Sequence, residues 1–292
     1  MKGYAEFAMR GPAQGAIAAA LPTATLFLSW LGAAIVALFV LRHGLGKSTL
    51  VLLGALVPAA FWMHAGDVGP LTTTICAVLL ALVLRQARNW SLVLLMIPVV
   101  VGLWCVVIVV ALPDYVEFVR VVFEQLLERF RERLTQSLSE AELENMRQFT
   151  APSGVQVIGM IAVMQAVTSA FSLLVARWWQ SMLYNPGGFR GEFHKLRLER
   201  IHALLLVAGF VAVVSQPTYQ IWGWLFIVPL LIAGVALVHS VVNRLNMGTG
   251  WLVAFYLLVF VLVRPLMALL AAIAVADSAL DFRSRFAVRS DR

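Results

Sequence analysis

Long apolar runs separated by short polar turns make up most of this chain. Several windows stay apolar for about 18 residues or more, the length at which a helix crosses the hydrocarbon core of a bilayer. The runs that predict membrane spans cover residues 12–41, 48–64, 71–84, 90–112, 155–176, 201–215, 219–239 and 250–276. Because a backbone in lipid must satisfy its own hydrogen bonds, the pattern predicts an all-α polytopic membrane helical bundle of about seven to eight spans. We expect one integral membrane domain over residues 1–292.

Residues 113–153 have a different pattern, with apolar residues recurring every three to four positions, as in an amphipathic helix. These positions are Val119, Phe123, Leu126, Phe130, Leu134 and Leu138. Ser139 and Glu142 have the spacing of a capping box, which predicts the start of a second short helix. We therefore expect an extramembrane amphipathic helix pair at about 113–150, an insertion that lies over the mouth of the bundle.

Composition supports the membrane assignment. The chain is 61% hydrophobic and 13% charged, whereas a soluble domain carries about 25% charged residues. The net charge is +7, but the stretch from Asp114 to Arg147 holds eight acidic residues against five arginines. Lys and Arg gather on the cytoplasmic side of membrane proteins, so we expect a bacterial inner-membrane protein with loop 177–200 cytoplasmic and 113–153 on the opposite face. No basic stripe on a soluble fold indicates nucleic-acid binding.

The first and last apolar runs leave two topologies open. If each crosses once, both chain ends lie opposite loop 177–200, together with Lys2, Arg10 and the C-terminal arginines. Both runs contain a proline, at Pro22 and Pro265, so each could instead be re-entrant and return its chain end to the cytoplasm. Two full crossings need about 40 residues, which neither run has, so only partial insertion is possible. The charges favour cytoplasmic ends.

Arg264, near the middle of the last run, is the sharpest candidate for a ligand contact. An arginine in mid-bilayer costs at least ~2.5 kcal/mol, so it usually faces the bundle interior and a partner. One hypothesis is an anion or substrate contact in an internal cavity, with Trp222 and Gln165 as further ligand-binding residues. The other is a structural arginine, bonded to carbonyls that Pro265 frees or snorkelling to the interface.

The stretch 177–200 is basic and aromatic, which suits contact with anionic lipid headgroups or docking of a partner protein. The candidate docking residues in it are Trp178, Trp179, Phe189, Arg190, Lys195 and Arg197. A second candidate docking face combines the small-residue spacings of Gly11 with Gly15 and of Ala16 with Ala20, which let helices approach closely in lipid.

Catalytic chemistry has little support in the sequence. No nucleophile is paired with a base, no carboxylates are paired within a span, and no His, Cys, Asp or Glu set has metal-ligand spacing. Cys76 and Cys105 each lie inside an apolar run, where a cysteine behaves as a small buried hydrophobe. We expect neither enzymatic activity nor a cofactor or metal.

Three short motifs resemble the YybS-like family of bacterial multi-pass membrane proteins of unknown function. They are the turn Leu41-Arg42-His43-Gly44-Leu45, the loop Pro186 to Phe189-Arg190, and the C-terminal motif of Asp277, Asp281, Phe282 and Arg283. That family is distantly similar to the substrate-binding components of energy-coupling factor vitamin transporters. Those are small helical bundles with a pocket near the outer face and a docking face of small residues in the first helix. The resemblance implies this docking role for Gly11, Gly15, Ala16 and Ala20, although a minimal six-helix component lacks an insertion like 113–153.

Two functions therefore stay open. The first is a transporter-type bundle that binds a small molecule, which rests on the resemblance alone. The second is a membrane scaffold or assembly factor that docks membrane or cytoplasmic proteins through loop 177–200. The lipid bilayer is a partner in either case.

Overall fold

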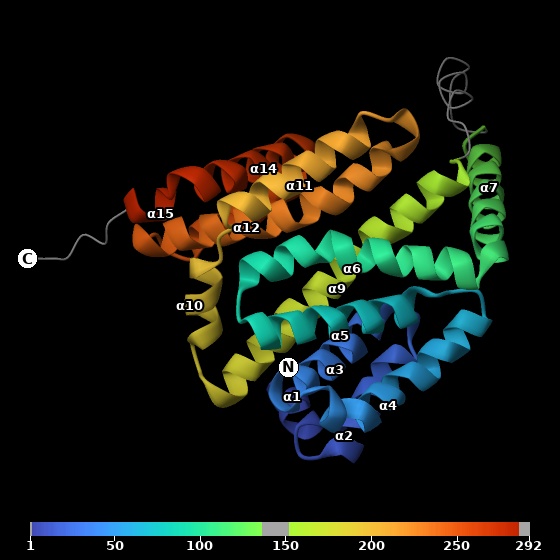
Figure 1. Ribbon diagram of the computed structural model, residues 1–292, viewed down its shortest axis with the longest axis horizontal. Coiled ribbons are helices and arrows are strands. Elements are labelled where there is room, and N and C mark those ends of the chain that lie inside the picture. Colours follow the sequence, from blue (N-terminus) through green and yellow to red (C-terminus); the bar gives the residue numbers. More distant parts are fainter. Residues whose placement is uncertain (1, 136–151, 286–292) are drawn as a thin grey trace, which may run out of the picture.

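The computed structural model describes residues 2–135 and 152–285, and all regular structure in these ranges is helical (Figure 1). The elements are α1 (Lys2–Ala8), α2 (Pro12–Thr23), η1 (Leu26–Leu28), α3 (Ser29–His43), α4 (Leu45–His64), α5 (Gly69–Ala87), α6 (Trp90–Ala111), α7 (Pro113–Thr135), α9 (Gly154–Tyr184), α10 (Gly188–Lys195), α11 (Arg200–Val214), η2 (Pro217–Trp222), α12 (Gly223–Arg244), α13 (Gly250–Val261), α14 (Val263–Leu280) and α15 (Phe282–Arg285).

Seven helical stretches within the described ranges are long and apolar enough to cross a membrane. They are Leu26–His43, Leu45–His64, Gly69–Ala87, Trp90–Ala111, Gly154–Tyr184, Pro217–Arg244 and Val263–Leu280. Two further apolar helices, α11 and α13, are shorter. The prediction of an all-α polytopic helical bundle is confirmed.

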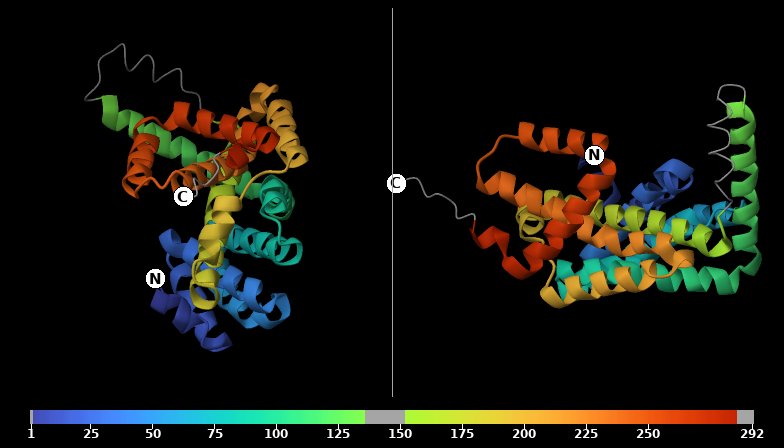
Figure 2. Two further views of the ribbon diagram at one scale, coloured as in Figure 1. Left: turned by 90° about the vertical axis from the view of Figure 1, so that its left-hand side faces the viewer. Right: turned by 90° about the horizontal axis from the view of Figure 1, so that it is seen from above.

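The turns between the spans gather at two ends of the molecule (Figure 1). The arginine-rich end comprises the α3–α4, α5–α6 and α12–α13 turns together with α10 and α15, and Figure 2 (left) looks onto it. Its basic residues are Arg42, Lys47, Arg85, Arg88, Arg177, Arg190, Lys195, Arg197, Arg200, Arg244 and Arg283. The α7 end comprises α7 and the α4–α5 and α11–η2 turns. The α13–α14 turn lies between the two ends, because α13 starts at the arginine-rich end and has only 12 residues. Outside α7, Arg264 is the one lysine or arginine among the described residues that reaches the α7 end, where it lines a groove with Gln220 of η2.

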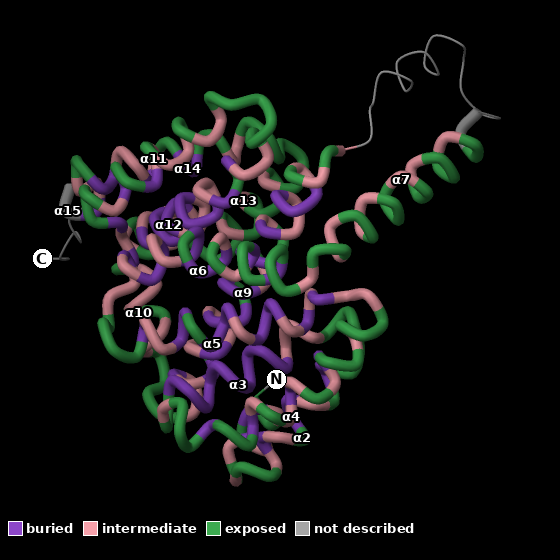
Figure 3. Tube along the Cα trace, turned by 45° about the vertical axis from the view of Figure 1, so that its right-hand side comes forward, coloured by how far each residue is buried: buried purple, intermediate pink, exposed green. Residues whose placement is uncertain are grey.

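The 31-residue helix α9 organises the bundle. It runs diagonally between the group α1–α5 and the group α11–α14, and it packs against α3, α5, α6, α12 and η2 (Figure 1). Its first turn is fixed by a capping box, in which Ser153 accepts from the Gln156 amide and Gln156 from the Ser153 amide. The core that surrounds it is densest along α3, where every residue from Gly32 to Leu41 is buried (Figure 3).

The structure corrects the boundaries of the predicted loop 177–200. Residues 177–184 continue α9, and α10 occupies most of the remainder. A helix that has left the hydrocarbon core needs no further apolar residues, so the fall in hydropathy at Arg177 marks the membrane edge and not the helix end. The helix ends at Tyr184 with Asn185 as its C-cap, and Gly187 then takes a left-handed backbone with φ of 85°.

Both terminal apolar runs fold as hairpins with one short leg. In the first, α2 turns into η1 and α3, and the two legs touch where Gly32 lies against Thr23 and the Ala19 carbonyl. In the last, the chain breaks at Leu262 between α13 and α14. Since α2 and α13 have 12 residues each, they span about 18 Å, less than the ~30 Å hydrocarbon core. Both ends of the described chain therefore lie toward the arginine-rich end (Figure 1).

The amphipathic helix α7 turns away from the end of α6 and runs crosswise to the spans (Figures 1 and 2). Only its first turns contact the bundle, and the rest projects sideways beyond it (Figure 3), which corrects the expectation that this insertion covers the mouth of the bundle. The predicted second helix of the pair, with Ser139 and Glu142, lies outside the described residues.

Candidate functional site

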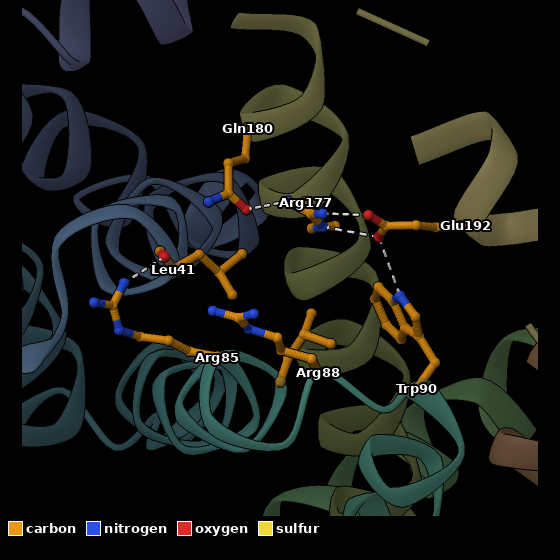
Figure 4. Close-up of a pocket in the computed structure, with 8 residues that line it drawn as sticks. Leu41, Arg85, Arg88, Trp90, Arg177, Gln180 and Glu192 are labelled. Carbon is orange, nitrogen blue, oxygen red and sulfur yellow. Dashed lines mark hydrogen bonds and ion pairs between the residues drawn. The ribbon is translucent and has the colours of Figure 1, made fainter. Parts of the chain in front are cut away.

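A cavity of about 490 Å³ opens at the arginine-rich end, between α3, α5, α6, α9 and α10 (Figure 4). Three arginines, one glutamate, an amide and an indole contribute to its wall. The lining residues are Leu41, Leu84, Arg85, Arg88, Trp90, Arg177, Gln180 and Glu192. We refer to it as the arginine cavity.

Arg85 is held at the C-terminal end of α3. Its Nη1 donates to the Leu41 carbonyl at 2.7 Å, and carbonyls in the last turn of a helix carry partial negative charge that favours a cation. Gly44 ends α3 with φ of 82°, a left-handed conformation that a side chain would strain. The Leu41–Leu45 turn, one of the resemblance motifs, thus forms the wall around Arg85.

Arg177 is fixed by α10. Its Nε donates to Glu192 Oε2 at 2.9 Å, and a second nitrogen donates to Glu192 Oε1, so the carboxylate is bound bidentately. Arg177 also donates to Gln180 Oε1 at 2.5 Å, and Trp90 Nε1 donates to Glu192 at 3.4 Å. Glu192 therefore ties α10 to both α9 and α6 (Figure 4).

Arg88 differs from the other two arginines. It ends α5 in the left-handed region, with φ of 51°, and its guanidinium makes no hydrogen bond or ion pair with the described residues. The four charged side chains of the arginine cavity sum to +2. The cavity therefore presents one unpaired guanidinium between two that are already oriented, an arrangement that suits a bound oxyanion.

A second, more apolar cavity of about 420 Å³ lies on the other side of α10, with α13 along its edge. Here the structure brings together three predicted docking residues, Trp178, Phe189 and Arg190, with His239 and Tyr256. Arg190 donates to Asn243 Oδ1 at 2.7 Å. On α10 itself, burial lowers the pKa of His194, and the nearby Arg190, His239, Arg283 and Arg244 lower that pKa further.

The C-terminal motif forms a compact electrostatic cluster at the arginine-rich end. Asp277 binds Arg283 Nε at 3.2 Å and accepts from the Phe282 amide at 3.0 Å, and both charged side chains are almost fully buried. Arg283 also donates to the His194 carbonyl of α10 at 2.7 Å. Burial lowers the pKa of Arg283. Asp281 pairs with Arg197 at 2.7 Å, in a much more exposed position.

The small residues of α2 lie against the bundle. A Cβ added to Gly15 would lie within 3 Å of Phe39 and Val51, so Gly15 is buried between α3 and α4. Ala16 packs against Gly54 of α4. Gly11 and Ala20 are partly exposed on the same helix.

The remaining two docking candidates have opposite environments. Trp179 is fully buried, with its ring 6.3 Å from that of Tyr4 of α1. Lys195 is exposed.

The three predicted ligand residues lie in separate environments. Arg264 is exposed at the α7 end, where it lines an open groove of about 350 Å³ with Gln220 and Trp224. It lies at the tip of the α13–α14 hairpin and not in mid-span, because the chain breaks at Leu262. Trp222 Nε1 donates to the Val155 carbonyl at 3.0 Å and so holds η2 against α9.

Gln165 is buried between spans, where Thr73 of α5 donates to its Oε1 at 2.6 Å. It lies in a polar seam between α5 and α9, and Trp104 Nε1 extends this seam by donating to Thr72. Among the residues described, no group of three or more His, Cys, Asp or Glu side chains could hold a metal ion.

The sequence patterns did not single out the arginine cavity, because its wall combines residues that are distant in the chain, from Leu41 to Glu192. The sequence contains only a weak indication of this cavity: Arg85 and Arg88 lie close together at a turn, and Glu192 is a rare acidic residue in a basic stretch.

A comparison with protein families matches residues 15–278 to a family described as a predicted membrane protein, DUF2232. Searches of curated proteins and of solved structures found no match. The match covers most of the chain, so this protein belongs to the DUF2232 family of predicted membrane proteins.

Proposed function

We propose that this protein is a transporter-type membrane component that binds a small anionic molecule, and that the arginine cavity is its binding site. The observation that carries the proposal is the unpaired Arg88 guanidinium in a cavity already walled by Arg85 and Arg177. Catalysis is not part of the proposal.

The dimensions and chemistry of the cavity support binding of a small molecule. Its volume of about 490 Å³ lies in the range of ~300–1,000 Å³ that is usual for ligand sites. Arg88 and the free amide nitrogen of Gln180 can donate to an oxyanion, while Leu41, Leu84 and Trp90 can cover an organic part. The anion is either a soluble molecule or the phosphate of a lipid headgroup, which share this chemistry.

The transporter-type role rests on the resemblance to YybS-like proteins and, more distantly, to substrate-binding components of energy-coupling factor transporters. In this proposal the arginine-rich end is cytoplasmic in the bacterial inner membrane, in line with the concentration of Lys and Arg there. The proposed ligand site is therefore at the cytoplasmic end, and neither in the bundle interior near Arg264 nor near the outer face, where the resemblance implies a pocket.

Anion titrations test the proposal directly. The purified protein in phosphatidylcholine nanodiscs is heated in the presence of inorganic phosphate or succinate, with chloride at matched ionic strength as the reference. We expect a specific anion to raise the unfolding temperature, and Arg88→Gln to weaken its binding about 10- to 100-fold, because a hydrogen bond to a charged group contributes ~1.5–3 kcal/mol. Uptake of that anion into proteoliposomes then separates transport from binding alone.

The matched control is Arg264→Gln, which removes an arginine from the groove at the α7 end. It should leave anion binding unchanged, and an equal loss in both variants would argue against the arginine cavity. A second set of nanodiscs containing phosphatidylglycerol identifies a lipid ligand, since stabilisation by that lipid should then require Arg88. If neither soluble anion nor lipid has an effect that depends on Arg88, the proposal is wrong.

A scaffold role is the second candidate, and the exposed surface of α10 favours it. Arg190 and Lys195 are exposed there, beside the aromatic cavity that contains Trp178 and Phe189. If this surface docks a partner protein, affinity purification after mild solubilisation should lose that partner in Arg190→Ala/Lys195→Ala but keep it in Arg88→Gln. An unchanged set of partners in both variants would count against docking.

A further inference from the structure

The orientation of α7 carries an inference that is independent of the arginine cavity. The helix starts at Pro113, directly after α6, and runs crosswise to the spans at their α7 end (Figures 1 and 2). A helix in this position lies parallel to the plane of the membrane, at the level where the spans end.

Contacts with the bundle show which side of α7 faces the membrane. A Cβ added to Gly66, in the α4–α5 turn, would lie 2.9 Å from the ring of Phe118. A Cβ added to Gly154, at the start of α9, would lie 3.1 Å from Val116. Val116 and Phe118 lie about 160° apart around an α-helix, so both contacts together show that the arc between them faces the bundle. Because the turns that α7 touches are the ends of spans, this arc faces the membrane.

The same side of α7 continues as an apolar face beyond the edge of the bundle. At 3.6 residues per turn, Val122, Phe123, Leu126 and Phe130 all point into the arc between Phe118 and Val116. Leu126 and Phe130 are each 58% exposed. Such a row of exposed large side chains on one helix face marks an interaction surface and not a solvated helix.

The opposite side of α7 suits water. Arg120 pairs with Glu117 and Glu124, and Arg131 pairs with Glu128 at 2.7 Å. These ion pairs between neighbouring turns leave the polar face balanced and hydrated. The two faces of α7 are therefore matched to different surroundings.

The apolar face is also continuous with the surface that faces lipid. Val106, Val107 and Val110 on the last turns of α6 are exposed, the last of them by 77%. The chain passes from this flank through Leu112 directly into α7. Lipid that covers the end of α6 therefore extends beneath the first residues of α7.

We propose that α7 is an interfacial helix that rests its apolar face on the lipid surface at the α7 end of the bundle. In this position Leu126 and Phe130 enter the boundary between headgroups and acyl chains, as in other amphipathic helices at membrane interfaces. Arg129 lies at the edge of the apolar face, and Arg133 follows Phe130 on that face one turn later. In these positions long cationic side chains can reach lipid phosphates while their stems stay in the apolar layer.

Site-directed spin labelling in membranes tests this placement. Cys76 and Cys105 are first replaced by alanine, and single cysteines are introduced at Leu126, Phe130 and, as the matched control on the polar face, Glu128. Each variant is labelled and reconstituted into vesicles of phosphatidylcholine and phosphatidylglycerol. Collision rates with oxygen, which is enriched in lipid, and with a water-soluble nickel chelate are then measured.

We expect the ratio of oxygen to nickel collisions to be several-fold higher at Leu126→Cys and Phe130→Cys than at Glu128→Cys. Nickel access at the apolar positions equal to that at Glu128→Cys would mean that the face is in water. Low access to both reagents would mean that protein covers it. Either result overturns the proposal, and neither bears on anion binding by the arginine cavity.

Discussion

The buried ion pair of the C-terminal motif gives the sharpest stability prediction. Asp277 and Arg283 have side-chain exposures of 2% and 6%. Asp277→Asn keeps the size of the side chain but leaves the guanidinium buried without its counter-charge. Although burial lowers the pKa of Arg283, an arginine does not lose its proton in a protein at accessible pH. The variant must therefore bury an uncompensated cation or release α15.

The expected cost follows from the burial of this pair. Removing one partner of a buried ion pair destabilises a protein by ~3–5 kcal/mol. The neighbouring Arg197–Asp281 pair has a similar separation of 2.7 Å, but its side chains are 37% and 47% exposed. Exposed pairs contribute only ~0–1 kcal/mol. Arg197→Gln, in the same region of the structure, is therefore the matched control.

Equilibrium unfolding in a mild detergent measures both variants. We expect Asp277→Asn to lose at least ~2 kcal/mol more than Arg197→Gln. In Asp277→Asn/Arg283→Met both charges are absent, so much of the stability should return, because no cation remains buried. Equal losses in the two single variants, or a double variant no more stable than Asp277→Asn, would refute the assignment of a buried, energetically coupled pair.

Three further predictions concern packing, protonation and topology. Gly54→Ala should destabilise the protein by ~1–3 kcal/mol through overpacking, because the new Cβ would lie 2.7 Å from a carbonyl oxygen of α2. Gly102→Ala is the control, because Gly102 has open space around it, and it should leave stability unchanged in the same unfolding assay. Stability should fall as the pH drops below 6.5, the ordinary pKa of histidine. The pKa of His194 is lowered in the folded protein, so the unfolded chain binds a proton at a higher pH than the folded protein does. His194→Gln should therefore flatten the dependence of stability on pH. A membrane-impermeant maleimide should label Gly191→Cys from the cytoplasmic side and Glu128→Cys from the other side, and labelling of both from one side would contradict the proposed orientation.

The spans and α7 could be predicted from the sequence because each follows from a single physical requirement. A helix in lipid needs about 20 apolar residues, whatever it packs against. An amphipathic helix shows its period directly, as the apolar positions from Val119 to Phe130 do. Neither requirement depends on tertiary contacts.

The position of Arg264 could not be predicted in this way, because an apolar run does not show where a hairpin turns. For the run from Gly250 to Ala276 the sequence leaves a single span and a re-entrant hairpin open, and the structure shows two legs that meet at Leu262. Pro265 was the available signal: it lies in the first turn of α14, where a missing amide hydrogen is tolerated, and so marks a helix start.

The arginine cavity was beyond prediction for a different reason. Its charges come from α5, α9 and α10, and only the packing of α9 along α5 brings Arg177 near Arg88. The sequence of 177–200 predicts a surface for anionic lipid headgroups or for docking of a partner protein. In the structure Glu192 from that stretch faces inward and binds Arg177, while Lys195 faces outward.

The three motifs that carry the family resemblance are all connected by contacts to the wall of the arginine cavity. The Leu41–Leu45 turn holds Arg85, and α10 carries Glu192, which holds Arg177. The C-terminal motif reaches the same helix from the other side, because Arg283 binds the His194 carbonyl two residues after Glu192. A contiguous set of contacts thus runs from Asp277 through α10 to the cavity wall. If these contacts position Glu192, then Asp277→Asn should also weaken anion binding, whereas a purely local role in stability would leave the affinity of the folded protein unchanged.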